Sequence, residues 1–408
     1  MTTVEGSISL VEALKDPAVR ADPYPLYAQL REMGRLVPTV FGAHLVTRHA
    51  DCFAVLRDAR LSSNQSHQAG WDNVQQLVES LGFADLFGIM TRAMLFADPP
   101  DHTRLRRIGS KAFTPRAVED MRPRIADIVD GLLDAAAEKG EMEVVADLAF
   151  PLPVTVISEM LGIPATDHEM LRDWTSKAVK VLDPNDDFMA LLPAAEGIRN
   201  MREYFDGFIA ERRRAPGDDL TSALIAAEDE GETLSHDELL DTMILLFGAG
   251  HETTVNLISG GVLNLRQHPD ELARLQADPS MIGTAVEELL RFGPPVQVSA
   301  RNATCDVEVA GTTIPKGSQL IVMIAGANRD PEVFADPERL DIGRTENRHL
   351  AFGGGIHLCL GAPLARIEGQ EAIGRLVQRF PSMALVDDEV TWKETSTIRG
   401  PASLRVSL

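Results

Sequence analysis

Apolar residues recur at helical spacing over most of the chain, and the longest such stretch covers residues 236–267. Ser235 followed three positions later by Glu238 has the pattern of a capping box, and Pro269 lies just beyond the other end. A helix of this length spans about 45 Å at about 1.5 Å per residue, the width of a whole domain. Because residues 242–249 are almost entirely apolar, we expect this helix to be buried inside a large protein.

The remaining pattern is also mostly helical. Residues 62–91 have no clean period, which fits either a variable loop over a substrate pocket or a connecting segment. Short strand patterns separated by turn residues occur at 37–46 and 306–324. Further helices are predicted at residues 116–137, 201–214 and 360–375, and another begins near residue 98. The predicted fold class is therefore mainly α with small β-sheets.

Composition narrows the class of protein. Of the 408 residues, 44% are hydrophobic and 25% are charged, which is ordinary for a soluble protein. Three widely spaced cysteines, Cys52, Cys305 and Cys359, favour a reducing compartment over a disulfide framework. We expect a cytoplasmic protein, since neither a membrane span nor a signal peptide is recognisable. The net charge of −22 disfavours nucleic acid and anionic membranes as partners.

The stretch Phe-Gly-Gly-Gly-Ile-His-Leu-Cys-Leu-Gly, residues 352–361, carries the most specific chemistry. Its glycines allow the backbone to turn sharply and to approach a ligand closely. Cys359 directly precedes a predicted helix, where unpaired N–H groups favour a thiolate. A thiolate in this setting suits an axial ligand of heme iron or a nucleophile, and the residues alone leave both open.

The stretch resembles the heme-binding loop of the cytochromes P-450, Phe-Gly-x-Gly-x-(Arg/His)-x-Cys-x-Gly, at every specified position. The resemblance implies that Cys359 binds the iron of heme b, as thiolates do in this family. It implies that Phe352, Gly353, His357 and Gly361 of the same loop also contact the cofactor. It further implies the family's fold, with a long central helix over the heme.

Two glycines inside the predicted central helix, Gly248 and Gly250, each cost about 1 kcal/mol relative to alanine. Close approach of a flat macrocycle at Ala249 and Gly250 would explain them. The hydroxyl of Thr253 can bond back to the carbonyl of Ala249 and loosen the helix. The segment Ala-Gly-His-Glu-Thr is similar to the family's proton-delivery motif, which implies that Glu252 and Thr253 are catalytic and supply protons.

Further matches to the family concern charged residues. Glu288 and Arg291 match its Glu-x-x-Arg motif; at i and i+3 they share a helix face, and we expect a structural ion pair joined by Arg339. The heme propionates need cations, and guanidinium and imidazole groups suit carboxylates. The positions that match the family's propionate-binding residues are His102, Arg106, Arg301 and His357.

The resemblance implies a single catalytic domain, 1–408, that acts as a monooxygenase on a C–H or C=C bond. We expect a hydrophobic substrate of secondary metabolism, such as a polyketide, macrolide or terpenoid. Nothing resembles a flavin or nicotinamide domain, so a separate ferredoxin and ferredoxin reductase are expected to supply electrons. Substrate contacts are expected from Met94, Leu95, Leu246, Ala249, Val296, Gln297, Val298, Thr397 and Ile398.

The ferredoxin is expected to dock near the thiolate side, at Arg104, Arg107, Lys111 and Arg366, on a monomeric enzyme. Two alternatives stay open. A peroxide-dependent peroxygenase would share the cysteine loop but would typically lack the Glu252–Thr253 pair. A heme-binding sensor without enzymatic activity would need only Cys359 and the propionate cations.

Overall fold

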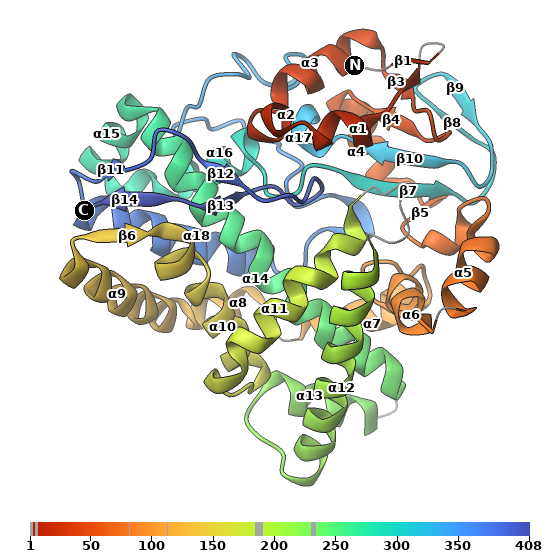
Figure 1. Cartoon of the computed structure of the whole chain (residues 1–408), viewed down its shortest axis with the longest axis horizontal. Coiled ribbons are helices and arrows are strands. Elements are labelled where there is room, and N and C mark those ends of the chain that lie inside the picture. Colours follow the sequence, from red (N-terminus) through yellow and green to blue (C-terminus); the bar gives the residue numbers. More distant parts are fainter. Residues whose placement is uncertain (1–2, 5–6, 81, 112, 184–190, 230–233) are drawn as a thin grey trace.

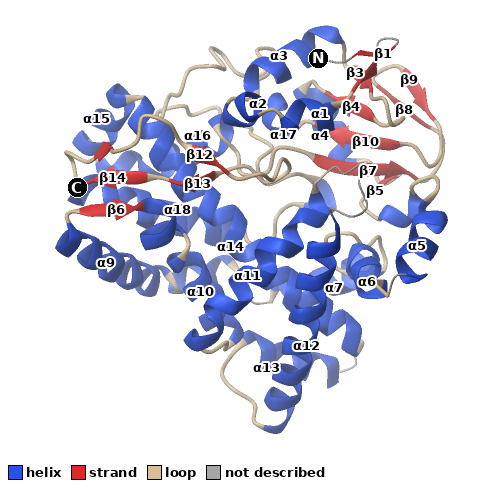
Figure 2. Ribbon diagram, viewed as in Figure 1, coloured by secondary structure: helices blue, strands red, loops and turns tan. Residues whose placement is uncertain are grey.

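The computed structural model describes residues 3–4, 7–80, 82–111, 113–183, 191–229 and 234–408. Helices dominate this part of the chain, and the largest sheet lies at one side of the molecule, at the upper right of Figure 1. Figure 2 shows the same contrast between the helical body and the strands. The predicted class, mainly α with small sheets, is confirmed.

The helices of the N-terminal half frame the sheet and then form the helical body. They are α1 (Leu10–Lys15), α2 (Pro17–Ala21), α3 (Tyr24–Met33), α4 (His49–Arg57), α5 (Trp71–Ser80), α6 (Ala84–Arg92), α7 (Asp101–Ser110), α8 (Pro115–Asp120), α9 (Arg122–Lys139) and α10 (Pro151–Leu161). The later ones are α11 (His168–Ala178), α12 (Leu192–Arg214), α13 (Leu220–Asp229), α14 (His236–Gln267), α15 (Pro269–Ala277), α16 (Ile282–Phe292), α17 (Ile324–Ala327) and α18 (Ala362–Arg379). Short helical turns include η2 (Val145–Ala149), η4 (Val179–Leu182) and η7 (Gly355–His357).

The strands are short and form separate sheets. The five-stranded sheet has the order β3-β4-β10-β7-β5, with β10 parallel to β4 and antiparallel to β7. Its strands are β3 (Leu36–Pro38), β4 (His44–Val46), β5 (Leu61–Ser62), β7 (Ser299–Ala303) and β10 (Gln319–Val322). The other strands are β1 (Thr3–Val4), β2 (Ser7–Ile8), β6 (Glu141–Glu143), β8 (Val307–Val309), β9 (Thr312–Ile314), β11 (Ala384–Leu385), β12 (Thr391–Trp392), β13 (Pro401–Ser403) and β14 (Arg405–Ser407).

The central helix α14 has the predicted bounds. Its capping box is formed, because the Glu238 N–H donates to Ser235 Oγ at 3.2 Å and the Ser235 N–H donates to Glu238 Oε2 at 2.7 Å. The helix packs against α10, α12, α16 and α18, and crosses the middle of the molecule in Figure 1. Its burial on several sides explains why its sequence is apolar over much of its circumference.

A glycine sets the distance between α14 and the helix that follows the cysteine loop. A Cβ at Gly261 would lie 2.7 Å from Ile373 Cδ1 of α18 and 3.2 Å from Leu289 Cδ1 of α16. Larger residues would force the helices apart. Close packing here fixes α14 relative to the loop that carries Cys359.

Three predicted segments differ from the structure. Residues 62–91 contain α5 and α6, whose buried Val78 and Leu86 escape a periodicity search because each helix is short. The helix expected at 116–137 is divided between α8 and α9, since Pro123 opens a new helix after Met121. The helix expected at 201–214 begins earlier, at Leu192. Among the described residues, none of the helices is both long and apolar enough to cross a membrane.

Candidate functional site

The loop before α18 holds Cys359 in a fixed position. The Cys359 N–H donates to the Phe352 carbonyl at 2.9 Å, and the Gly353 N–H donates to the Leu350 carbonyl at 2.8 Å. Gly353 and Gly355 have φ angles of +71° and +67°, a region that side chains disfavour. A Cβ at Gly355 would also overlap the Leu56 carbonyl, so the loop lies directly against α4. Glycine is required here by both conformation and space.

The Cys359 sulfur lies at the end of the glycine-rich loop, directly before α18. The residue is exposed, yet protein surrounds its thiol closely enough that burial raises the thiol pKa. The N–H groups of Gly361 and Ala362 and the positive charge of Arg106 oppose that rise. A cation bound to the sulfur would favour the thiolate outright, and the N–H groups would then moderate its electron donation.

Basic side chains from three segments lie close together near Cys359. His102 and Arg106 come from α7, Arg301 from β7 and His357 from η7. The rings of His102 and His357 have centroids 4.4 Å apart. Burial, then the charge of Arg301, lowers the pKa of His357 to about 3, and burial lowers the pKa of Arg301 to about 10.

These cations lack the acidic partners that buried charges normally require. Among the described residues, no carboxylate lies within ion-pair distance of Arg106 or Arg301, and the buried Nε2 of His102 has no hydrogen-bond partner. Arg106 and Arg301 supply positive charge and the two imidazoles supply N–H donors, so the cluster is suited to a ligand with carboxylates. Heme, which carries two propionates and an iron that a thiolate can bind, would fit this donor set and the nearby thiol.

The predicted oxygen-activating segment of α14 has the expected hydrogen bond. Thr253 Oγ1 donates to the Ala249 carbonyl at 3.0 Å. Ala249 is exposed on the open side of the helix, as predicted for a residue that faces a ligand. At position 250, a Cβ would lie 3.2 Å from Cγ1 of Ile157 in α10, a packing reason for glycine that the sequence did not predict. The missing side chain of Gly250 therefore makes room for Ile157.

Glu252 is a buried acid, and within the described part of the chain it forms an ion pair with Lys393. Its Oε1 accepts a hydrogen bond from Lys393 Nζ at 2.5 Å, and Lys393 follows β12 near the C-terminus. Burial alone would raise the pKa of Glu252, but Lys393, followed by His251, outweighs burial and lowers it. The carboxyl group is thus ionised. Lys393 was not predicted, because it lies 141 residues from Glu252 in the chain and no motif marks it.

Glu288 and Arg291 form a pair that is inaccessible to solvent. Arg291 donates to both carboxylate oxygens of Glu288 at 2.8 Å. The prediction that the Arg339 side chain joins this pair is wrong. Arg339 contributes its carbonyl, which accepts from Arg291 at 3.0 Å, while the Arg344 side chain reaches Glu288 at 3.1 Å. Sequence position near the motif could not distinguish the two arginines.

Comparison with known proteins agrees with this geometry. The family model for cytochrome P-450 matches residues 84–397. Cytochrome P-450 CYP107DY1 of Priestia megaterium is 44% identical over 369 residues, 89% of this chain and 89% of that protein. The chain belongs to the cytochrome P-450 family. The enzyme is thus a cytochrome P-450 monooxygenase, and the family implies a heme cofactor and the binding of a substrate and O2.

Two further relatives support the assignment of fold and family. The polyketide biosynthesis cytochrome P-450 PksS of Bacillus subtilis is 40% identical over 383 residues, 93% of this chain and 91% of that protein. The crystal structure of the myxobacterial cytochrome P-450 CYP267B1 in complex with myristic acid has a TM-score of 0.89 and 43% identity. That alignment covers 98% of this P-450 and 99% of the other chain.

Residues expected to contact substrate come from separate parts of the P-450. Val296 and Ile398 pair in an antiparallel bridge, so two of the expected segments lie side by side. Met94, Leu246 and Val298 are nearly buried, whereas Leu95 is exposed. The Gln297 amide is already committed, since it accepts from Tyr27 Oη at 3.2 Å and donates to the Pro294 carbonyl at 2.6 Å. The Thr397 hydroxyl likewise donates to the Leu182 carbonyl at 2.8 Å.

Residues expected to dock a ferredoxin include cations that already have partners. Arg366 donates to Glu287 at 2.6 and 2.9 Å and stacks over Phe352, 4.5 Å from the ring centroid. Arg104 pairs with Glu238 at the start of α14. These contacts reduce the charge that either residue presents to a partner. They also tie the cysteine loop and α7 to the helical body.

Proposed function

We propose that this P-450 binds heme b through the Cys359 thiolate and inserts one oxygen atom of O2 into a C–H or C=C bond. When bound, the thiolate-ligated heme supplies the iron centre that activates O2. His102, Arg106, Arg301 and His357 would hold its propionates, which would give Arg106 and Arg301 anionic partners. Phe352, Gly353 and Gly361 shape the loop around Cys359.

The observation that carries the proposal is the state of Glu252 beside Thr253. Glu252 is buried and ionised, so it can accept a proton from water and pass it inward. The Thr253 hydroxyl donates to the Ala249 carbonyl of its own helix, and by rotation it could donate a hydrogen bond on the exposed side of α14 instead. A peroxide-using enzyme or a heme sensor would not need this pair of groups, so oxygenation driven by electron transfer is favoured.

The substrate we propose is a hydrophobic small molecule of secondary metabolism, such as a polyketide, macrolide or terpenoid. The candidate contacts Met94, Leu246, Val298 and Ile398 are apolar, which suits a molecule with few charged groups. The name of PksS refers to polyketide biosynthesis, and CYP267B1 was crystallised with a fatty acid. Both relatives are consistent with a largely apolar substrate.

Electrons come, in this proposal, from a separate ferredoxin and its reductase, which serve a monomeric P-450 of one catalytic domain. The partner would approach from the side of Cys359, near α7 and the start of α18. The candidate contacts are Arg104, Arg107, Lys111 and Arg366, of which Arg104 pairs with Glu238 and Arg366 with Glu287. Charge reversal at Lys111 with unchanged salt dependence of the reaction would contradict this docking site.

The proposed function is tested by comparing product formation from O2 and NADH with product formation from added peroxide. Purified protein is supplied with a surrogate ferredoxin, reductase and NADH, and a panel of polyketides, terpenes and steroids is screened by spin-state shift and oxygen uptake. We expect product that contains one atom from labelled O2. Product formed only with added peroxide would indicate a peroxygenase, and heme binding without product under either condition would indicate a sensor.

A further inference from the structure

The tip of the C-terminal hairpin, residues 395–398, joins two segments of the P-450 that are distant in the chain. The hairpin is formed by β12 and β13, which pair antiparallel. The Gln297 N–H donates to the Thr397 carbonyl of the tip at 2.8 Å. Val296 forms an antiparallel bridge with Ile398. The tip also contacts the end of η4, the helical turn that follows α11.

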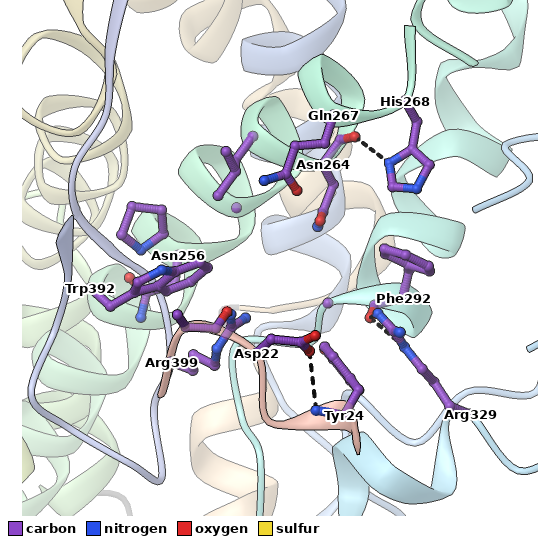
Figure 3. Close-up of a pocket in the computed structure, with 16 residues that line it drawn as sticks. Asp22, Tyr24, Asn256, Asn264, Gln267, His268, Phe292, Arg329, Trp392 and Arg399 are labelled. Atoms are coloured by element: carbon purple, nitrogen blue, oxygen red, sulfur yellow. Dashed lines mark hydrogen bonds between the residues drawn. The ribbon is translucent and has the colours of Figure 1, made fainter. Parts of the chain in front are cut away.

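The base of the hairpin is anchored by Arg399, beside a polar pocket of about 260 Å³ (Figure 3). The guanidinium group donates to the carbonyls of Arg20 and Ala21 at 2.9 and 2.6 Å. It also stacks over Trp392 of β12, 3.7 Å from the ring centroid. Figure 3 shows both side chains among those that line the pocket. The base of the hairpin is thus held independently of η4.

The tip is held to η4 by the carboxylate of Asp183, the residue that ends this helical turn. Its Oδ1 accepts from the N–H groups of Thr397 at 2.7 Å and Ser396 at 3.0 Å. The same oxygen accepts from the Ser396 hydroxyl at 3.2 Å. In return, the Thr397 hydroxyl donates to the Leu182 carbonyl at 2.8 Å. The two segments are therefore joined by hydrogen bonds in both directions.

The carboxylate of Asp183 is devoted to the tip and not to a counter-charge. Within the described ranges, its partners are the donors of Ser396 and Thr397, and no Lys, Arg or His forms an ion pair with it. Burial raises the pKa of Asp183, and these donors oppose the rise. Because the donors offset the cost of burial, the carboxylate and the tip stabilise each other's position.

We propose that Asp183 is a positioning residue that closes one wall of the substrate chamber and limits the size of the molecules that exchange through it. The inference rests on the proposed function, in which Val296, Thr397 and Ile398 contact the substrate. Asp183 fixes Thr397, and Thr397 is bonded in turn to Gln297. Without the carboxylate the tip would separate from η4, and the chamber would admit and release bulky apolar molecules more readily.

Hydrogen exchange tests whether Asp183 holds the tip, and it requires no substrate. In the heme-loaded protein, Asp183→Ala should raise the exchange rate of residues 395–398 about tenfold, because two N–H groups lose a charged acceptor. Asp183→Asn should stay within about twofold of the wild type, since its amide oxygen can accept the same bonds. Asp167→Ala is the matched control. Asp167 lies at the opposite end of α11, where it accepts from Tyr204 Oη at 2.7 Å.

Azole ligands of two sizes test whether the tip limits the chamber. Imidazole and clotrimazole both bind heme iron through a ring nitrogen, and stopped-flow absorbance follows their dissociation. We expect Asp183→Ala to release clotrimazole about tenfold faster and imidazole at the wild-type rate. Asp183→Asn and Asp167→Ala should release both ligands at the wild-type rate. A general loosening of the protein would accelerate both ligands alike.

A second variant replaces Asp183→Ala if that protein does not fold. Thr397→Val removes the hydroxyl bond to Leu182, and we expect the same size-dependent release of azoles at about threefold. Unchanged exchange of residues 395–398 in Asp183→Ala would overturn the proposal. Faster exchange without size-dependent release of azoles would overturn it as well.

These measurements involve no turnover, so the inference and the proposed function can fail separately. If product forms only with peroxide while Asp183→Ala releases clotrimazole selectively, the proposed use of O2 and NADH is wrong and the role of Asp183 stands. If product forms from O2 and NADH but neither exchange nor azole release changes in Asp183→Ala, the role of Asp183 is wrong and the proposed function stands.

Discussion

Two buried carboxylates, Glu288 and Glu252, lie in regions of the P-450 that differ in how completely their charges are paired. Glu288 is saturated with donors of fixed geometry. These donors are the side chains of Arg291, Arg344 and Asn347 and the N–H of Asp341, at 2.8 to 3.1 Å for their closest contacts. Glu252 accepts from one flexible ammonium group, that of Lys393.

This difference distinguishes a buried charge with a structural role from one that can take part in proton transfer. A carboxylate with every lone pair occupied cannot take up a proton without losing a hydrogen bond. Glu288 is therefore suited to hold α16 against the segment around Pro337. Glu252 shares the ammonium group of Lys393 with Asn256 Oδ1, has unused acceptor capacity, and can exchange a proton at little structural cost.

The largest expected effect comes from breaking the saturated pair. Arg291→Ala would leave Glu288 buried without its main partner, and we expect a loss of about 3–5 kcal/mol in the free energy of unfolding. Chemical denaturation of the purified protein measures it. Arg339→Ala is the control and should change stability by less than about 0.5 kcal/mol, because only its backbone carbonyl takes part. Equal losses in both variants would contradict this assignment.

Substitution of Glu252, whose carboxylate has unused acceptor positions, should change activity more than stability. Glu252→Gln removes the exchangeable proton, and we expect a fall of about 100-fold in product formation. The same variant should cost only about 1 kcal/mol of stability, since Lys393 is partly exposed and can be hydrated. Product assays and denaturation on the same preparation measure both quantities. A stability loss as large as that of Arg291→Ala would remove the contrast between the two sites.

Removing a charge from the propionate-binding residues should stabilise the heme-free protein and weaken its binding of heme. Arg106→Met removes a guanidinium group whose charged form is disfavoured by burial, so the heme-free protein should become slightly more stable. Heme release to apomyoglobin should accelerate about tenfold, because a propionate loses a charged partner. Arg104→Met on the same helix is the control, since its guanidinium pairs with Glu238. Unchanged heme release in Arg106→Met would refute the role of the cluster.

The smallest expected effect is a shift in the pH dependence of coupling when Lys393 is replaced. Lys393 lowers the pKa of Glu252, and without it burial would raise that pKa above its ordinary value. Ionised Glu252 would then be lost at a higher pH as the solution is acidified. In Lys393→Met, the fall in product formed per NADH at acidic pH should begin at a higher pH than in the wild type. In Lys393→Arg, it should begin at the same pH. An unchanged pH in Lys393→Met would show that the lysine does not tune the acid.

Much of this P-450 could be predicted from local sequence signals. The bounds and capping box of α14 follow from Ser235, Glu238 and Pro269, and the Thr253 bond to Ala249 follows from the four-residue spacing. The cysteine loop could be identified because its glycines are required by backbone geometry. Signals of this kind depend only on neighbours in the chain.

The rest depends on contacts between distant segments. Lys393 meets Glu252 only because the segment after β12 lies against α14, and Arg344 replaces Arg339 only because of how the loop after α17 folds. The reason for Gly250 lies in Ile157 of α10. The carboxylate of the half-buried Asp183 accepts hydrogen bonds from the N–H groups of Ser396 and Thr397. The segment that follows it, residues 184–190, lies outside the described residues.

The measurement that tests the central claim most directly is the absorption spectrum of the reduced protein under carbon monoxide. If Cys359 is the thiolate ligand of heme iron, the wild type should show the strongly red-shifted Soret band of thiolate ligation. Cys359→Ser should lose that band, and Cys305→Ser, at an exposed cysteine elsewhere, should keep it. An unshifted band in the wild type, or an identical red-shifted band in Cys359→Ser, would contradict the account.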